Sequence, residues 1–279
     1  MRSIVALTAA VIAVAATGSA QQTYTERMAH EHAADKPIAS PAAEVEPRQP
    51  VTTETVTYAT VNGAPVSGYL ARPRDASGPL PGIIVIHEWW GLNDNIRSMA
   101  RRLAGEGYEV LAVDLYGGAA AQTPDAARAL MQRVMDDPGP AQDNLRQAAA
   151  YLRDTRKVRK LGVIGWCFGG GWSLQTALML PDRVDATVMY YGRLETDRQR
   201  LKALRAPLLG LFGAADTGIP VAGVRQFEAT LKELGKPAVI HVYEGAAHAF
   251  ANPSGTAYKA DAAADAWLKT VAFLAEHLK

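Results

Sequence analysis

One segment of the 279-residue chain constrains the fold most: an apolar run ending in Gly165-Trp166-Cys167-Phe168-Gly169, followed by a helical pattern. A Gly-x-Cys-x-Gly turn between a strand and a helix is typical of a nucleophile elbow, whose central residue has a strained backbone and whose glycines avoid collisions with the adjoining strand and helix. Cys167 would then lie at a helix N-terminus, which favours the thiolate. The spacing fits neither the dinucleotide fingerprint nor a P-loop. A buried structural cysteine is the alternative.

Two later segments supply the partners that such a nucleophile needs. The apolar run 207–213 is followed by Asp216, and the predicted strand 238–243 is followed by His248. On this scaffold the nucleophile, acid and base occur in that order, the last two on loops after later strands. Of the six histidines, only His248 is both downstream of the cysteine and on a predicted loop. The order therefore predicts a Cys167-His248-Asp216 triad.

The rest of the pattern indicates the fold class. Residues 51–59 and 66–71 alternate in polarity around an Asn62-Gly63 turn, which predicts an opening β-hairpin. From residue 83 onward, short apolar strands alternate with helical segments. We therefore expect an α/β protein, with a mostly parallel sheet covered by helices on both faces and functional groups at the carboxyl ends of the strands.

These residues resemble the dienelactone hydrolase family of the α/β-hydrolase fold over about residues 51 to 279. The resemblance is carried by the elbow and by His87-Glu88-Trp89-Trp90-Gly91-Leu92-Asn93, Asp114-Leu115-Tyr116, Tyr190-Tyr191-Gly192 and His248-Ala249-Phe250. It implies that Cys167 is the nucleophile, His248 the base and Asp216 the acid that orients it. It also implies that Glu88 is an additional carboxylate that interacts with the cysteine and helps control its ionisation.

The expected reaction is acyl transfer from a small-molecule carboxylic ester or lactone through a thioester at Cys167. One oxyanion donor should be the N–H of Phe168, the residue after the nucleophile. The resemblance implies the N–H of Trp89 as the second. The alternative is an exported thiol-based redox or binding protein that keeps the fold without turnover. Neither a cofactor nor a metal is expected.

The chain departs from the family pattern in one respect. Members that cleave dienelactones have an arginine shortly after the Asp-Leu-Tyr segment and another a few residues after the histidine, and both hold the substrate's carboxylate. Here those stretches read Gly117-Gly118-Ala119 and Ala251-Asn252-Pro253. The resemblance therefore implies hydrolase chemistry without implying a dienelactone substrate.

The N-terminal region predicts export. A positive start, an apolar stretch and small residues up to Ala20 are typical of a secretory signal, so we expect residues 1–20 to be a signal peptide and the protein to be periplasmic or secreted. The apolar stretch is short for a membrane span, and no stable membrane association is expected. Residues 21–50 read as a flexible polar leader, in which His30 and His32 alone do not make a metal site.

Composition and charge add two constraints. The chain is 48% hydrophobic with a net charge of +1, which suits one globular domain at 51–279 and argues against a nucleic-acid partner. Cys167 is the only cysteine, so no intramolecular disulfide forms. A lone thiol in an oxidising compartment suggests a chemical task for the sulfur. The sequence does not indicate the oligomeric state.

Overall fold

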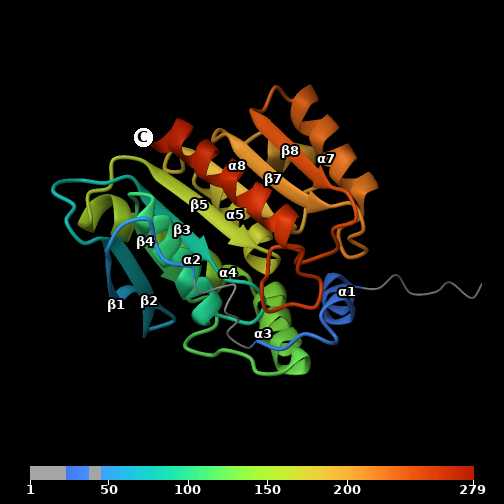
Figure 1. Ribbon diagram of the computed structural model, residues 1–279, viewed down its shortest axis with the longest axis horizontal. Coiled ribbons are helices and arrows are strands. Elements are labelled where there is room, and N and C mark those ends of the chain that lie inside the picture. The colour runs from blue at the N-terminus through green and yellow to red at the C-terminus, as the bar shows by residue number, and fades with distance from the viewer. Residues whose placement is uncertain (1–22, 38–44) are drawn as a thin grey trace, which may run out of the picture.

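A computed structural model describes residues 23–37 and 45–279. Its eight-stranded sheet has the order β1-β2-β4-β3-β5-β6-β7-β8 and is mostly parallel, as predicted (Figure 1). The strands are β1 (Val51–Val61), β2 (Ala64–Pro73), β3 (Gly82–Ile86), β4 (Glu109–Val113), β5 (Leu161–Trp166), β6 (Ala186–Tyr190), β7 (Leu208–Gly213) and β8 (Ala238–Tyr243). Strand β7, which contains most of the apolar run 207–213, is separated from the elbow strand β5 only by β6. The predicted site residues follow the carboxyl ends of the parallel strands and so lie at the same edge of the sheet.

The predicted hairpin joins β1 to β2. Asn62 and Gly63 both have positive φ angles, of 51° and 77°, as a two-residue turn of the favoured hairpin type requires. β1 and β2 are antiparallel, and β2 pairs antiparallel with β4, whereas every pairing from β4 to β8 is parallel. Strands β3 to β7 are buried along their whole length, which explains their continuous apolar sequence.

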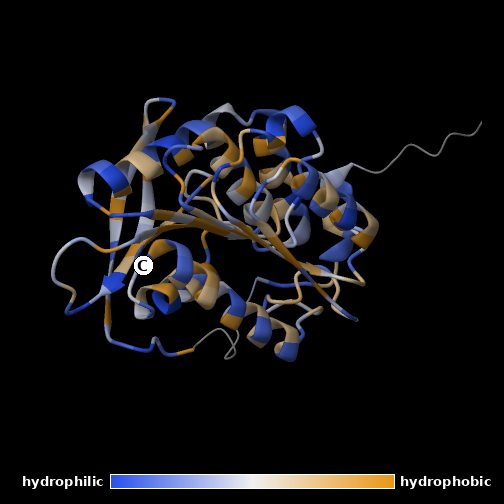
Figure 2. Cartoon of the chain, turned by 90° about the horizontal axis from the view of Figure 1, so that it is seen from above, coloured by the Kyte–Doolittle hydropathy of each residue, from blue (hydrophilic) through white to orange (hydrophobic). Residues whose placement is uncertain are grey.

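Helices cover both faces of the sheet, and Figure 2 shows the apolar strands between them. Two glycines of β5 show how closely the helices pack. A Cβ at Gly162 would meet Leu278 of helix α8 (Ala260–Leu278), whereas a Cβ at Gly165 would meet Gly169 of helix α5 (Phe168–Met179). Positions 162 and 165 point to opposite faces of a strand, so α8 and α5 cover opposite faces. The helices are α2 (Asp94–Gly105), α3 (Pro124–Asp136), α4 (Gly139–Ala150), the π-helix η2 (Tyr151–Thr155), α5 (Phe168–Met179), α6 (Arg198–Leu201), α7 (Val221–Glu233) and α8 (Ala260–Leu278).

A further helix, α1 (Tyr24–Glu31), lies in the region that we expected to be a flexible leader. Its N-terminus is a capping box: the Thr23 side chain accepts from the Glu26 N–H, and the Glu26 carboxylate accepts from the Thr23 N–H. Met28 and Thr25 on one side of the helix are buried. The described part of this region is therefore structured and packed on the domain. The predicted signal peptide, residues 1–20, lies outside the described residues.

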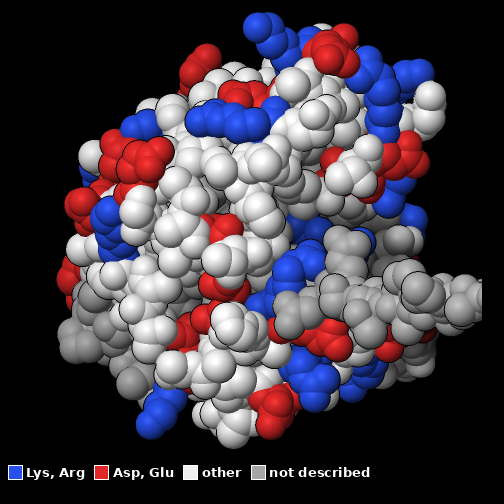
Figure 3. Space-filling view, turned by 90° about the vertical axis from the view of Figure 1, so that its right-hand side faces the viewer, with Lys and Arg blue, Asp and Glu red and all other residues white. Residues whose placement is uncertain are grey.

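Side chains of both charges are intermixed on the face that carries α1 (Figure 3). No helix among the described residues is long and apolar enough to cross a membrane.

Candidate active site

The predicted elbow is formed as its sequence requires. Cys167 has φ 52° and ψ −116°, a strained conformation, between the end of β5 and the start of α5. A Cβ at Gly165 would lie 2.1 Å from the carbonyl oxygen of Gly169, and a Cβ at Gly169 would lie 2.3 Å from the carbonyl oxygen of Ile86. Only glycine fits at either position, because each contact is with the backbone.

His248 and Asp216 form a buried pair beside the cysteine. The Nδ1 of His248 lies 2.7 Å from Oδ2 of Asp216, and the other carboxylate oxygen accepts from the N–H of Ile219 at 2.7 Å. Since Asp216 holds Nδ1–H, the ring presents Nε2 as its free nitrogen. That Nε2 is buried and has no hydrogen-bond partner among the described residues. The structure thus brings together Cys167, His248 and Asp216.

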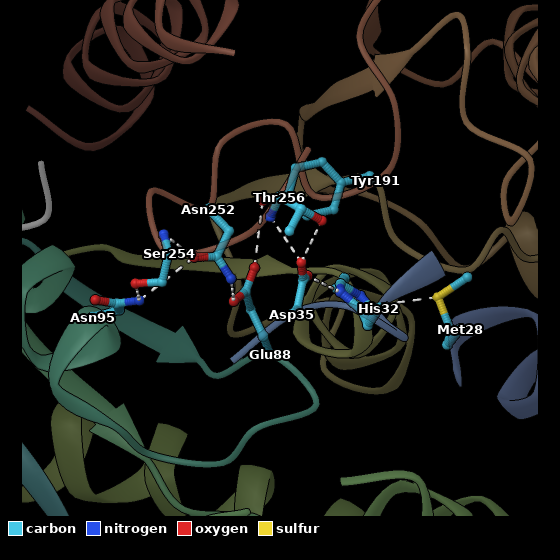
Figure 4. A network of polar contacts seen from close by, with 10 residues as sticks. Met28, His32, Asp35, Glu88, Asn95, Tyr191, Asn252, Ser254 and Thr256 are labelled. Carbon is cyan, nitrogen blue, oxygen red and sulfur yellow. Dashed lines mark hydrogen bonds and ion pairs between the residues drawn. The ribbon is translucent and has the colours of Figure 1, made fainter. Parts of the chain in front are cut away.

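The site also contains a second histidine that sequence reasoning assigned to a solvated leader. His32, just after α1, is fully buried with its Nε2 3.8 Å from Sγ of Cys167. Its Nδ1 lies 2.8 Å from Oδ2 of Asp35, and its ring stacks on Trp89 with centroids 4.7 Å apart. Met28 places its Sδ 3.9 Å from the same Sγ (Figure 4). The prediction that His32 lies in a solvated leader was wrong, because it did not consider that this segment could pack against the rest of the domain.

Thr256 fixes the position of this second pair. Oδ1 of Asp35 accepts from both the N–H and the hydroxyl of Thr256 at 2.7 Å, which ties the leader to the loop after His248. The segment is also held at Thr25, whose hydroxyl donates to Gln132 of α3 at 2.5 Å. The T-x-x-E capping box at Thr23 was the one sequence signal that could have indicated a helix here.

The two histidines control the ionisation of the thiol. Burial by itself would raise the pKa of Cys167, but His248 and then His32 lower it to about 6. Burial likewise acts to lower the pKa of both histidines. The thiolate and Asp216 offset it at His248 and hold its pKa well above the ordinary value, while Asp35 and the thiolate raise the pKa of His32 to about 9. At neutral pH the site therefore holds a thiolate beside imidazolium groups.

Glu88 lies just past β3, as predicted, but binds other partners than the cysteine. Its Oε2 accepts from the Asn252 amide at 2.7 Å and its Oε1 from the Tyr191 hydroxyl at 3.4 Å, and no hydrogen bond to Cys167 is present among the described residues. Burial, and next the charge of Cys167, raise its pKa to about 8. The charge of the thiolate therefore acts on Glu88, and the raised pKa favours the neutral carboxyl group.

The two predicted oxyanion donors flank the cysteine. Phe168 is the first residue of α5, and Trp89 follows β3, the strand whose end contacts the elbow at Gly169. Neither backbone N–H has an acceptor within the described ranges.

Comparison with known proteins agrees with this fold. The model of the dienelactone hydrolase family matches residues 66–278. The chain belongs to this family. The protein Usf of Aquifex pyrophilus is 34% identical over 224 residues, covering 78% of this chain and 96% of that protein. A dienelactone hydrolase-like promiscuous phosphotriesterase from metagenomic libraries superposes with a TM-score of 0.74 at 26% identity, covering 82% of this chain and 99% of that one.

A dienelactone hydrolase from Anabaena variabilis superposes with a TM-score of 0.62 at 22% identity, covering 82% of this chain and 99% of that chain, and shares the fold. This dienelactone hydrolase family member is therefore a hydrolase with the predicted α/β architecture. The matched region begins at residue 66 and so does not include α1, His32 or Asp35.

Proposed function

We propose that this protein hydrolyses carboxylic esters or lactones with Cys167 as nucleophile, His248 as base and Asp216 as the acid that orients it. The observation that carries the proposal is the buried 2.7 Å contact between His248 and Asp216, which leaves Nε2 as the free ring nitrogen beside a strained elbow cysteine. A structural cysteine has no need of a strained backbone or of an ordered acid–base pair.

The reaction begins with attack of the Cys167 thiolate on the carbonyl carbon. The carbonyl oxygen takes the negative charge and accepts hydrogen bonds from the N–H groups of Phe168 and Trp89. His248 then donates its proton to the leaving alcohol, and a thioester remains on the cysteine. His248 next takes a proton from water, which attacks the thioester, releases the acid and restores the thiolate. Asp216 holds the required tautomer throughout and stabilises the imidazolium.

The acyl group of the substrate need not carry a carboxylate. Asn252 stands in the stretch where dienelactone-cleaving members have an arginine, and its amide is engaged by Glu88 at 2.7 Å. Gly118, in the other such stretch, donates its N–H to Asp114. Two arginines would contribute charge-assisted hydrogen bonds worth roughly 1.5–3 kcal/mol each to an anionic substrate. We therefore propose that the substrate needs no carboxylate on its acyl group. Arg193, which lines the pocket beside α1, is a cation that an anionic substrate would meet.

Access to the thiol requires a movement of the N-terminal segment. Cys167 is fully buried beneath Met28 and His32. A pocket lined by Tyr24, Phe168 and Arg193 lies alongside α1. Displacement of residues 23–37 would connect this pocket to Cys167. We further propose export of the protein through the signal-like residues 1–20, with cleavage near Gln21.

The test is hydrolysis of a panel of activated esters and lactones by the full chain and by Cys167→Ala. Loss of a triad nucleophile costs several orders of magnitude in rate, so we expect the variant to be inactive while folding normally. Ser173→Ala is the control, because Ser173 lies on α5 and its hydroxyl donates only to the Gly170 and Val188 carbonyls. More than a tenth of the wild-type activity in Cys167→Ala would refute the proposal.

Peroxide distinguishes the thiol-based redox alternative. A redox protein should be oxidised and then restored by a thiol reductant without ever turning over an ester. For a hydrolase, oxidation of Cys167 should abolish turnover that was present before.

A further inference from the structure

Four donor atoms that metals bind converge inside the closed site. They are Sγ of Cys167, Nε2 of His32, a ring nitrogen of His248 and Sδ of Met28. The first three lie within 4.8 Å of one another, and the two sulfur atoms are 3.9 Å apart. Because Asp216 occupies Nδ1 of His248, Nε2 is the nitrogen of that ring available to an ion. Figure 4 shows Met28, His32 and Asp35 of the N-terminal segment close together.

The spacing of these atoms fits four-coordinate metal binding. With metal–sulfur bonds of about 2.3 Å and metal–nitrogen bonds of about 2.0 Å, the donors of a tetrahedral site lie roughly 3.3 to 3.8 Å apart. The observed separations from Sγ of Cys167 are 3.8 Å to His32 and 3.9 Å to Met28. These two separations exceed the tetrahedral values by a few tenths of an ångström at most, and the ligand atom of His248 lies within 4.8 Å of those of Cys167 and His32.

His32 and His248 each pair with a carboxylate, as metal-binding histidines usually do. A metal-ligating imidazole usually donates its other N–H to a carboxylate that fixes the tautomer and orients the ring. Here His32 pairs with Asp35 at 2.8 Å and His248 with Asp216 at 2.7 Å. Asp35 is in turn anchored by two hydrogen bonds from Thr256. Two separate carboxylate–histidine pairs therefore aim their free nitrogens at one thiol.

The four donor side chains are shielded from solvent. All four side chains are buried, and Nε2 of His248 has no hydrogen-bond partner among the described residues. His32 lowers the pKa of the thiol, but the Cys167-His248-Asp216 set does not require the sulfur of Met28, so the proposed function leaves the thioether unexplained.

We propose that His32, Cys167, His248 and Met28 form a copper site in the closed structure. Soft thiolate and thioether ligands suit Cu(I), and two imidazoles, a thiolate and a weak methionine ligand make a recognised copper donor set. Binding of Cu(I) forms bonds to Sγ and to both Nε2 atoms, and any proton on those nitrogens leaves to solvent. The ion occupies the nucleophile and fastens the N-terminal segment over it, so copper also switches off hydrolysis.

The experiment is an anaerobic titration of the reduced full chain with Cu(I) in competition with a chromophoric Cu(I) chelator. We expect one ion per chain with a dissociation constant below about 1 µM. His32→Gln should weaken binding at least a hundredfold. Asp35→Asn, which only removes the orienting carboxylate, should weaken it about 10- to 100-fold.

His30→Gln is the matched control, because His30 is two positions away but exposed. It should bind copper like the wild type, whereas a surface His-x-His site would be weakened equally by the two substitutions. Met28→Leu keeps the apolar volume and removes the sulfur. It should weaken Cu(I) and leave Zn²⁺ affinity unchanged, since zinc makes little use of thioethers.

Absence of binding below micromolar, equal effects of His30→Gln and His32→Gln, or full binding by folded Cys167→Ala would each overturn the copper site. Circular dichroism and thermal unfolding establish that each variant is folded. The readout is metal affinity, so its outcome is independent of ester turnover. An active esterase that binds no copper refutes this inference alone, and a copper-binding protein without esterase activity refutes only the proposed function.

Discussion

Replacement of His32 by glutamine should raise the pKa of the Cys167 thiol. In the wild type the two histidines overcome the effect of burial and lower this pKa from an ordinary value of 9.0 to about 6. That difference corresponds to about 4 kcal/mol in favour of the thiolate. Asp35 and the thiolate raise the pKa of His32 to about 9, so the ring is positively charged beside the ionised thiol. The positive charge lies 3.8 Å from Sγ.

The size of the effect follows from that distance. Unit charges about 4 Å apart at an effective dielectric constant of about 20 interact by about 4 kcal/mol, and burial offsets part of this. His248 contributes the larger share and remains in the variant. We therefore expect His32→Gln to raise the pKa from about 6 to between about 7 and 8. At pH 6, the ionised fraction of the thiol should fall from about a half to about a tenth or less.

The assay is the ultraviolet absorbance of the thiolate as a function of pH. Cys167 is the only cysteine, so subtraction of the Cys167→Ala spectrum isolates its signal, and burial does not interfere as it would with an alkylating reagent. His30→Gln should titrate like the wild type, because His30 is exposed. If the His32→Gln curve superposes on the wild-type curve, then His32 does not bear the charge that stabilises the thiolate and the argument fails.

Three further predictions concern the acid, the extra carboxylate and the elbow. Asp216→Asn should lower kcat by about 10⁴-fold, because the asparagine sets the wrong tautomer of His248. Glu88→Gln should lower kcat by less than about tenfold. Steady-state kinetics that show the opposite ranking would exchange the roles of the two carboxylates. Burial first, and the nearby thiolate next, raise the pKa of Glu88 to about 8. The protonated carboxyl group therefore stabilises the fold fully below the ordinary pKa of 4.5, and this stabilisation is lost as pH rises through 8. Glu88→Gln should therefore flatten the fall in Tm between pH 5 and 8, and parallel Tm profiles for the two proteins would contradict this. Gly165→Ala should destabilise the fold by about 3 kcal/mol or more in urea unfolding, because its Cβ would lie 2.1 Å from the Gly169 carbonyl oxygen. The control Gly139→Ala should be close to neutral, because the nearest contact of its Cβ is a side-chain atom at 3.3 Å. Equal unfolding midpoints for the two variants would contradict the steric argument.

The sequence was informative wherever a short-range rule applies. Side chains are sterically excluded at Gly165 and Gly169, and the buried strands are continuous apolar runs. Both features depend on residues close together in the chain, so they can be recognised in the sequence. The order of Cys167, Asp216 and His248 sufficed to place each at a strand end, because parallel strands bring all their carboxyl ends to one edge. The fold class and the family followed from the same features.

The N-terminal segment shows what only the tertiary structure decided. Its capping box is local, but an eight-residue helix with a polar composition is not stable by itself, so the sequence favoured a flexible leader. Its structure depends on contacts with residues far along the chain: His32 meets Cys167 135 positions later, and Asp35 meets Thr256 221 positions later. Neither contact leaves a periodic or compositional trace. The sequence by itself determined where the elbow cysteine would lie, and long-range packing alone determined that a second histidine–aspartate pair would cover it.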